Sequence, residues 1–121
     1  MRTVLVVDDS RIGEIAGKIA SKLDIPCQFL EAGTRNQALQ ALETYKVSLV
    51  LLDWDTPALD CMDLLRRIRS MPNYRDVPVI MVTSEVAKFK VVEALETGAT
   101  DYILKPIEEK VLTEKITEIL L

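Results

Sequence analysis

The sequence predicts an α/β fold in which a parallel sheet is covered by helices on both faces. Short apolar segments alternate with longer segments of helical periodicity along the whole chain, a pattern typical of right-handed βαβ units. The apolar segments are nearly continuous runs of Val, Ile, Leu or Phe, as expected for strands buried on both faces. Acidic or reactive side chains follow four of these runs directly, which predicts a functional site at one edge of the sheet.

The expected strands are the five apolar segments. We place them at residues 3–8, 27–31, 48–53, 78–83 and 101–104. Pro26 and Pro78 stand where the second and fourth strands begin, and a strand tolerates a proline there because its missing N–H is not needed in the ladder. The two prolines therefore support these strand boundaries.

The expected helices follow the strands one by one. We place them at residues 11–23, 34–45, 60–70, 86–97 and 108–120. Ser10 and Thr34 can cap helix starts, and Gly98 can close the fourth helix in a left-handed conformation. Apolar residues of the last helix recur at helical spacing and define a buried face: Val111, Leu112, Ile116, Ile119 and Leu120.

The composition indicates one compact intracellular domain. With 121 residues the chain has a common domain size, and we expect a single domain over residues 1–121. The net charge of −4 and the lack of a long basic stretch argue against nucleic-acid binding, and Arg66, Arg67 and Arg69 are interpreted as a solvated helix face. No apolar run is long enough for a signal peptide or a membrane helix, so we expect a cytoplasmic protein without membrane contact.

The chain contains no histidine and only two cysteines. Without histidine, Ser-His and Cys-His nucleophile pairs and most zinc sites are excluded, and any histidine in the mechanism must belong to a partner. Cys27 and Cys61 lie far apart in the sequence and lack Cys-x-x-Cys spacing, so both are expected to be reduced thiols.

Side chains at the carboxyl ends of the expected strands form the candidate site. In an open parallel sheet, ligands bind beyond these ends. Asp8, Asp9 and Asp53 would repel one another there unless a cation neutralised them, and all-oxygen ligands favour Mg²⁺. A carboxylate can attack phosphorus when a metal and a second cation neutralise the transferred group, which makes Asp53 the candidate nucleophile and Lys105 the second cation.

These residues resemble the receiver domain of response regulators. The resemblance covers the whole chain and rests on four motifs: Asp8-Asp9, the segment 53–57, Val82-Thr83-Ser84 and the segment 98–106. Each motif alone is weak, but their order and spacing are specific. The resemblance implies a flavodoxin-like, doubly wound (βα)5 sandwich of three layers with the strand order 2-1-3-4-5.

The resemblance also implies the metal site and the chemistry. Asp53 would be the phosphoacceptor, Asp9 a direct Mg²⁺ ligand and Asp8 a ligand acting mainly through water, with the backbone carbonyl of Asp55 completing the set. The phosphoryl group would come from a sensor histidine kinase or a histidine phosphotransfer protein. The domain would turn over only itself and would signal by protein contact to an output partner that the sequence does not name.

Further positions acquire roles through the same resemblance. Thr83 would be the switch hydroxyl, with Lys105 as its charge-assisted partner, and Tyr102 the aromatic switch. The Lys105-Pro106 bond is expected to be cis. Asp55 and Glu85 would tune the lifetime of the acyl phosphate.

Several positions depart from the family pattern. Thr56 stands where methionine is common, and Cys61 replaces a glycine, so the turn into the third helix is expected to differ. The candidate partner surface is formed by Phe89, Val91 and Tyr102. In the fourth helix, helical spacing places five apolar residues on one arc, and Phe89 lies off it: Ala87, Val91, Val92, Ala94 and Leu95. Phe89 is either a partner contact or an aromatic packed along its own helix.

Two alternatives remain open from the sequence. Asp53-x-Asp55 imitates the acid pair of a haloacid-dehalogenase-type phosphatase, although Pro57 occupies a position where that motif has Thr or Val. A flavodoxin-like binding domain without phosphoryl chemistry would share the architecture, but a glycine-rich or hydroxyl-rich phosphate loop after the first strand is missing. In response regulators that dimerise through the fourth helix, fifth strand and fifth helix, charged residues usually bridge the two copies, and here Phe89 and Val91 stand where some of those charges would be expected. We therefore expect a monomer or a weak, phosphorylation-dependent dimer. The domain would be either a stand-alone protein or a part excised from a longer regulator.

Overall fold

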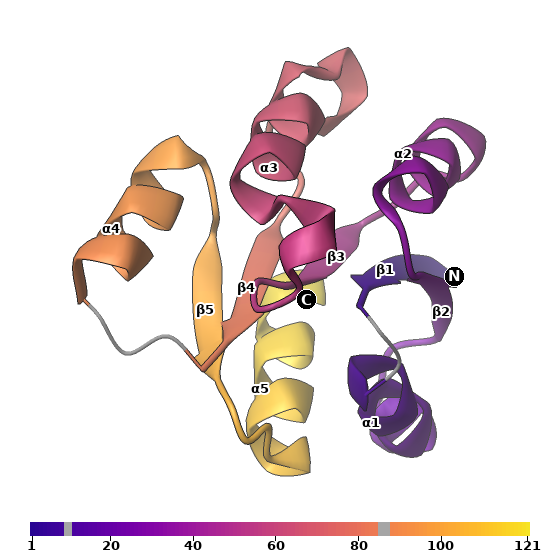
Figure 1. Ribbon diagram of the computed structural model, residues 1–121. Coiled ribbons are helices and arrows are strands. Elements are labelled where there is room, and N and C mark those ends of the chain that lie inside the picture. Colours follow the sequence, from indigo (N-terminus) through magenta and orange to yellow (C-terminus); the bar gives the residue numbers. More distant parts are fainter. Residues whose placement is uncertain (9–10, 85–87) are drawn as a thin grey trace.

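The computed structural model describes residues 1–8, 11–84 and 88–121 (Figure 1). Its strands are β1 (Arg2–Val7), β2 (Cys27–Ala32), β3 (Leu49–Asp53), β4 (Val79–Thr83) and β5 (Asp101–Leu104). Its helices are α1 (Arg11–Ile19), α2 (Arg35–Thr44), α3 (Cys61–Ser70), α4 (Lys88–Thr97) and α5 (Glu109–Leu120). The strands form one parallel sheet with the order β2-β1-β3-β4-β5, which confirms the predicted fold class and strand order.

Most element boundaries agree with the sequence prediction to within one or two residues. The first helix differs more, because α1 ends at Ile19 and a 3₁₀ turn, η1 (Ala20–Lys22), continues it. Thr34 caps α2, since its hydroxyl accepts a hydrogen bond from the Gln37 N–H at 3.1 Å. The predicted cap at Ser10 and the predicted helix start at residue 86 lie outside the described residues.

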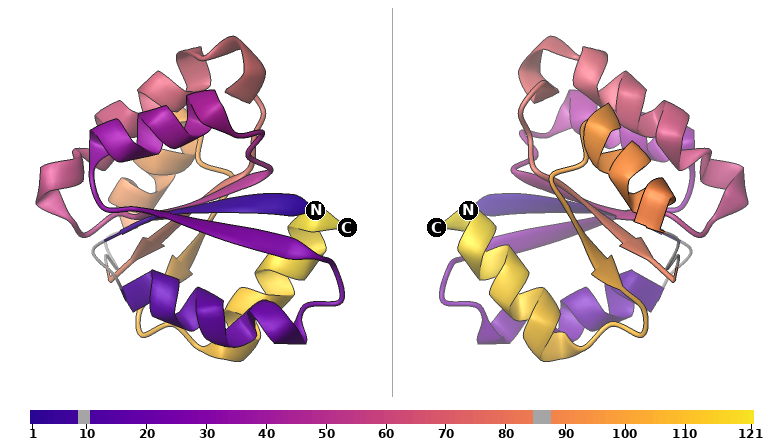
Figure 2. Two further views of the ribbon diagram at one scale, coloured as in Figure 1. Left: turned by 90° about the vertical axis from the view of Figure 1, so that its right-hand side faces the viewer. Right: turned by 90° about the vertical axis from the view of Figure 1, so that its left-hand side faces the viewer.

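Two apolar cores separate the sheet from its helices, and Figure 2 shows the resulting three layers. Helices α1 and α5 cover one face, where the buried residues include Ile12, Ile19 and Ile116. Helices α2, α3 and α4 cover the other face, with Leu42 and Leu64 among the buried residues. The strands supply alternate side chains to the two cores, as the continuous apolar runs required.

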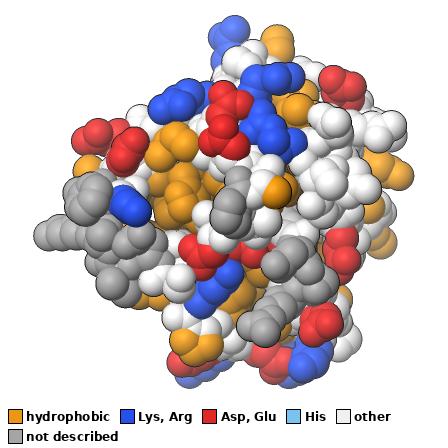
Figure 3. Space-filling view, viewed as in Figure 1, with side chains coloured by type: hydrophobic (Ala, Val, Ile, Leu, Met, Phe, Trp, Pro, Cys, Tyr) orange, Lys and Arg blue, Asp and Glu red, His pale blue; other side chains and the backbone are white. Residues whose placement is uncertain are grey.

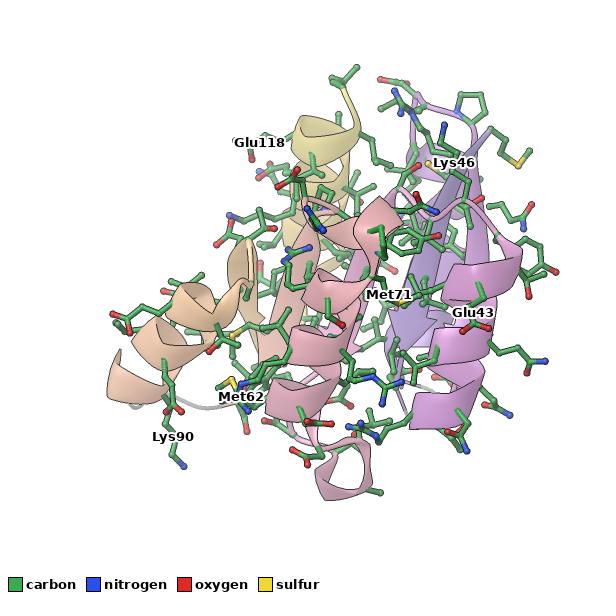
Figure 4. The ribbon with its side chains drawn as sticks, turned by 90° about the horizontal axis from the view of Figure 1, so that it is seen from above. Glu43, Lys46, Met62, Met71, Lys90 and Glu118 are labelled. Atoms are coloured by element: carbon green, nitrogen blue, oxygen red, sulfur yellow. The ribbon has the colours of Figure 1, made fainter. Side chains whose placement is uncertain are left out.

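The layer formed by α2, α3 and α4 is seen from outside in Figure 4, where Met62 lies on the side of α3 that faces α4. Met62 and Met71 are partly buried and pack against the core beneath this layer. In the described part of the chain, no helix is long and apolar enough to cross a membrane.

The carboxyl end of α4 is held by a glycine cap and an arginine. Gly98 has a φ of +132°, and the N–H of Ala99 donates to the carbonyl of Ala94 at 3.0 Å, which closes a Schellman-type cap. Arg69 Nε and Nη2 donate to the Gly98 carbonyl at 3.0 and 2.7 Å, and Nη1 donates to the Tyr74 carbonyl at 3.0 Å. The interpretation of Arg69 as part of a solvated face is therefore wrong, because it fastens α3 to α4.

The remaining charged surface is mixed in sign. Arg66 and Arg67 are exposed on α3, as predicted for the solvated face. Figure 3 shows acidic and basic side chains interspersed over one face of the molecule. On this face the two signs alternate and do not form the basic stripe of a nucleic-acid-binding surface.

Candidate functional site

The register of the sheet brings the predicted site residues to one edge. Val7 pairs with Leu52 across β1 and β3, so Asp8 and Asp53 follow next on neighbouring strands. On the other side of β3, Thr83 ends β4 and accepts a main-chain hydrogen bond from the Lys105 N–H at 2.9 Å. Parallel strands end at the same edge, and Asp8, Asp53, Thr83 and Lys105 therefore converge from four strands.

Asp8 is buried and caps helix α1. Only 3% of the residue is exposed, and its Oδ2 accepts hydrogen bonds from the N–H groups of Ile12 at 2.6 Å and Gly13 at 3.2 Å. Both N–H groups belong to the first helical turn, where the helix itself offers them no acceptor and where the helix dipole favours a negative charge. Asp9, the predicted direct metal ligand, lies outside the described residues.

Asp53 is a buried carboxylate with one oxygen held by the protein. Its Oδ1 accepts hydrogen bonds from the Asp55 N–H and from Lys105 Nζ, both at 3.0 Å, and the residue is 3% exposed. The Lys105-Pro106 peptide bond is cis. Burial lowers the pKa of Lys105, but its hydrogen bonds to Asp53 and Asp55 raise that pKa by more, so the ammonium stays charged beside the carboxylate.

The Asp55 carboxylate contacts three donors around Asp53. Its Oδ1 accepts from the Thr83 hydroxyl at 2.9 Å, and its Oδ2 accepts from the Ser84 N–H at 2.8 Å and lies 3.2 Å from Lys105 Nζ. Burial raises the pKa of Asp55, but the hydrogen bonds from Ser84, Thr83 and Lys105 bring it below its usual value. Sequence reasoning considered the backbone carbonyl of Asp55 and a tuning role, and it missed these side-chain contacts because they depend on the loop's path.

The turn into α3 is shaped by Asp60 and Cys61. The left-handed residue is Asp60, with φ +44° and ψ +66°, so Cys61 can begin the helix without a positive φ. The Cys61 thiol is buried and donates to the main-chain carbonyl of Asp53 at 3.0 Å. Burial, followed by the charges of Asp53 and Asp60, raises the pKa of Cys61 to about 12. Both cysteines are free thiols, which confirms the prediction from their spacing.

Arg35 supports the same loop from the start of α2. Its Nη1 donates to the carbonyls of Leu59 at 2.9 Å and Asp60 at 3.1 Å, and its Nη2 lies 2.5 Å from Asp63 Oδ2. Sequence reasoning did not identify Arg35, since a single arginine at a helix start gives no local signal of a contact that closes across 24 residues.

The apolar residues of α4 differ in how far they are buried. On α4, Ala94 is buried and Val91 half-buried, whereas Val92 is 41% and Leu95 38% exposed. Part of the apolar arc, at Val92 and Leu95, therefore faces solvent. Tyr102 on β5 is 38% exposed, and the side chain of Phe89 lies outside the described residues.

The carboxylates are compatible with a hard divalent cation. Within the described residues no hydrogen bond uses Asp8 Oδ1 or Asp53 Oδ2, so each buried carboxylate retains one oxygen for a further ligand. The described residues alone contain no cluster of three metal-binding side chains. Mg²⁺ needs no such cluster, since it keeps several waters and takes one or two carboxylates together with phosphate oxygens.

The fold and the strand-end site define a doubly wound α/β protein with a carboxylate, a lysine and a threonine gathered at the carboxyl edge of its sheet. The family model of the response regulator receiver domain matches residues 4–117. The chain belongs to the response regulator receiver domain family and is thus a receiver domain of two-component signalling, not a classical enzyme.

Comparisons with individual proteins agree with this assignment. The chain is 33% identical over 121 residues to the chemotaxis protein CheY1 of Helicobacter pylori, covering 99% of this chain and 97% of the relative. A response regulator from Thermotoga maritima has a TM-score of 0.84 at 29% identity, with coverage of 99% and 98%. The receiver domain of a sensor histidine kinase from Pseudomonas aeruginosa PAO1 has the same fold, with a TM-score of 0.82 at 23% identity and coverage of 98% and 97%. That structure contains a magnesium ion coordinated in its active site cleft.

Proposed function

We propose that the protein is a phosphoacceptor switch in which Asp53 receives a phosphoryl group from the phosphohistidine of a partner kinase or phosphotransfer protein. The observation that carries this proposal is the buried Asp53 carboxylate, which is paired with Lys105 at 3.0 Å at the carboxyl edge of the sheet. The 121 residues contain no histidine, so the donor imidazole must come from outside this domain.

In the transfer step, an Asp53 oxygen forms a bond to phosphorus while the P–N bond to the donor imidazole breaks. The nitrogen leaves with the bonding electron pair and is protonated. Lys105 offsets negative charge on the transferred group, and the Thr83 hydroxyl can donate to one of its oxygens. The product is an aspartyl phosphate, which water later hydrolyses, so the domain turns over only itself.

Mg²⁺ is the proposed cofactor, and when bound it would neutralise charge on the phosphoryl oxygens. Asp8, Asp9, Asp53 and the backbone carbonyl of Asp55 are its proposed ligands. Support comes from Asp8 Oδ1 and Asp53 Oδ2, which take part in no hydrogen bond among the described residues, and from the magnesium-bound receiver domain of Pseudomonas aeruginosa. Asp8 would serve two ends, since its Oδ2 caps α1 while Oδ1 remains available.

The proposed output is a change of the surface formed by α4, β5 and α5. Phosphate on Asp53 would favour the state in which Thr83 contacts it, and Tyr102 and the start of α4 would respond. Tyr102 is exposed next to this surface, and together with Val91 and Phe89 it belongs to the proposed partner contact. Asp55 and Glu85 would set the lifetime of the phosphate. The proposed unit is one domain, residues 1–121, acting as a monomer or a weak, phosphorylation-dependent dimer.

The test is intact-mass measurement after incubation with Mg²⁺ and acetyl phosphate. The wild type should gain the mass of one phosphoryl group, and Asp53→Asn should gain none. Asp60→Asn is the control. Asp60 lies near the site but is not a proposed ligand, and its substitution removes one negative charge, as Asp53→Asn does. No gain in the wild type, or an equal gain in Asp53→Asn, would refute the proposal.

A further inference from the structure

We propose that the Asp55 carboxylate is an internal competitor of the phosphoryl group. It accepts hydrogen bonds from the Thr83 hydroxyl and the Ser84 N–H and pairs with the Lys105 ammonium until the phosphoryl group displaces it. The proposal rests on the proposed function, in that it takes Asp53 as the residue that carries the phosphate.

The Asp55 carboxylate lies among the groups that surround Asp53. Lys105 Nζ lies 3.0 Å from Asp53 Oδ1 and 3.2 Å from Asp55 Oδ2, so one ammonium bridges the two carboxylates. Asp55 Oδ1 and Oδ2 lie 2.9 and 2.8 Å from the Thr83 and Ser84 donors. The carboxylate therefore presents two anionic oxygens to the donors that surround Asp53.

A phosphoryl group on Asp53 would need the same donors. A phosphoryl group on Asp53 brings three acceptor oxygens and about −1.5 to −2 charges, and it needs donors and a cation within hydrogen-bonding distance. In the described part of the chain, Lys105, Thr83 and Ser84 supply these groups, and all three already contact Asp55. The phosphoryl group and the Asp55 carboxylate would repel each other at these donors, so binding of the phosphoryl group favours release of Asp55.

The exposure of the side chains decides which anion can leave. The Asp55 side chain is 29% exposed, whereas the Asp53 side chain is 5% exposed. A partly exposed carboxylate can rotate into water and recover its hydration. Thr83 and Lys105 would then exchange one anionic acceptor for another, and phosphorylation replaces existing contacts instead of creating them all anew. The apparent affinity for the phosphoryl group is then the intrinsic affinity multiplied by the fraction of molecules in which Asp55 has released the donors.

The competition is measured with beryllofluoride, an analogue of a phosphoryl group, at saturating Mg²⁺. Trp54, the single tryptophan of the chain, follows Asp53 directly and is half-buried, so its fluorescence can report binding. We expect Asp55→Ala to bind beryllofluoride about tenfold more tightly than the wild type, which corresponds to about 1.4 kcal/mol. Asp55→Asn should show a smaller gain, because its amide oxygen can still accept one hydrogen bond.

Asp60→Asn is the matched control, since it removes one negative charge near the site without removing a contact to Thr83, Ser84 or Lys105. Asparagine also tolerates the positive φ of residue 60. We expect the affinity of this variant to stay within about twofold of the wild type. An equal gain in Asp60→Asn would overturn the proposal, because it would assign the effect to general charge.

A second measurement separates competition from support. Without ligand, Asp55→Ala should melt at a lower temperature than Asp60→Asn, because Thr83, Ser84 and Lys105 each lose their contact with the Asp55 carboxylate. Lower stability combined with tighter binding is the signature of an internal competitor. Equal or weaker binding by Asp55→Ala would refute competition, whereas failure of the wild type to bind, with no difference from Asp53→Asn, would refute the proposed function itself.

The amide signal of Ser84 in nuclear magnetic resonance gives an independent readout. In the wild type this N–H donates to an anionic oxygen both before and after binding, so its chemical shift should change little. In ligand-free Asp55→Ala it should shift upfield and return downfield with beryllofluoride. An unchanged Ser84 signal in Asp55→Ala would contradict the proposed contact.

Discussion

The thiol of Cys61 donates a hydrogen bond to the main-chain carbonyl of Asp53 over 3.0 Å, and it thereby joins the first residue of α3 to the end of β3. The residue at this position has a short side chain that is buried against the strand carrying the proposed phosphoacceptor. The link explains how the chain accommodates a cysteine where the family pattern has glycine. The thiol fills the space and finds a partner, while Asp60 adopts the left-handed conformation.

We expect Cys61 to be almost unreactive in the folded protein. Its pKa is raised to about 12 by burial and by the nearby charges of Asp53 and Asp60. Near pH 8 its thiolate fraction is on the order of one in ten thousand, and the thiolate is the reactive form. Titration with a thiol reagent should modify Cys27, which is half-buried, well before Cys61. Equal rates at the two cysteines would contradict this environment.

Arg69 should contribute strongly to stability through its contacts with α4. Arg69→Ala removes three hydrogen bonds to the carbonyls of Gly98 and Tyr74, and we expect the free energy of unfolding to fall by about 2 kcal/mol. Urea denaturation measures this change. Arg66→Ala is the control, since Arg66 is exposed on the same helix, and its effect should stay below about 0.5 kcal/mol. Equal losses in the two variants would show that the contacts of Arg69 between α3 and the end of α4 add no stability.

The ion pair of Lys115 with Asp101 should give a pH-dependent contribution to stability. The hydrogen bond to Asp101 is the largest effect and raises the pKa of Lys115. Since the folded-state pKa lies above the ordinary value of 10.5, the contribution is fully present below that value and is lost as the pH rises through the folded-state pKa. Because the pair is partly exposed, its worth is about 0.5 kcal/mol.

The comparison of wild type with Lys115→Met at several pH values tests this contribution. The wild type should be the more stable protein at neutral pH, and the difference should vanish in strongly alkaline solution. Lys22→Met is a useful reference, because Lys22 pairs with Glu109 at a more exposed position and its removal should cost less. A difference between wild type and Lys115→Met that grows with pH would contradict the assigned sign.

Magnesium should raise the melting temperature by relieving repulsion among the site carboxylates. Binding to the folded state alone stabilises it by about 2.7 kcal/mol when the free ion is at 100 times its dissociation constant. Thermal melts across millimolar Mg²⁺ measure the effect, and Asp8→Asn, which lacks one proposed ligand, should respond less. A wild-type melting temperature that is independent of Mg²⁺ would argue strongly against the metal site.

The sequence predicts the sheet and the residues at its edge well because both depend on the hydrophobic pattern. The strand ends at Asp53 and Thr83 follow from continuous apolar runs, and parallel pairing then places them at one edge. Contacts that depend on the loops were not predictable in this way. The acceptor role of the Asp55 side chain and the contacts of Arg35 require the path of the loop after β3.

The exposure of Val92 and Leu95 on α4 was not predictable for a related reason. Helical periodicity places Val92 and Leu95 with the apolar residues, yet the extent to which a helix is covered depends on its tilt against neighbours. Arg69 was mispredicted because an arginine in a basic run was assumed to face water, whereas its planar guanidinium donates two hydrogen bonds to the Gly98 carbonyl just after α4.

The most direct test of the central claim is to locate the phosphate. After phosphorylation with Mg²⁺ and acetyl phosphate, borohydride reduction converts an aspartyl phosphate to homoserine, which peptide mass spectrometry identifies by position. We predict homoserine at residue 53 and at no other aspartate of the site. Homoserine at Asp8, Asp9 or Asp55 in place of Asp53, or none in a sample that carries phosphate, would contradict the account.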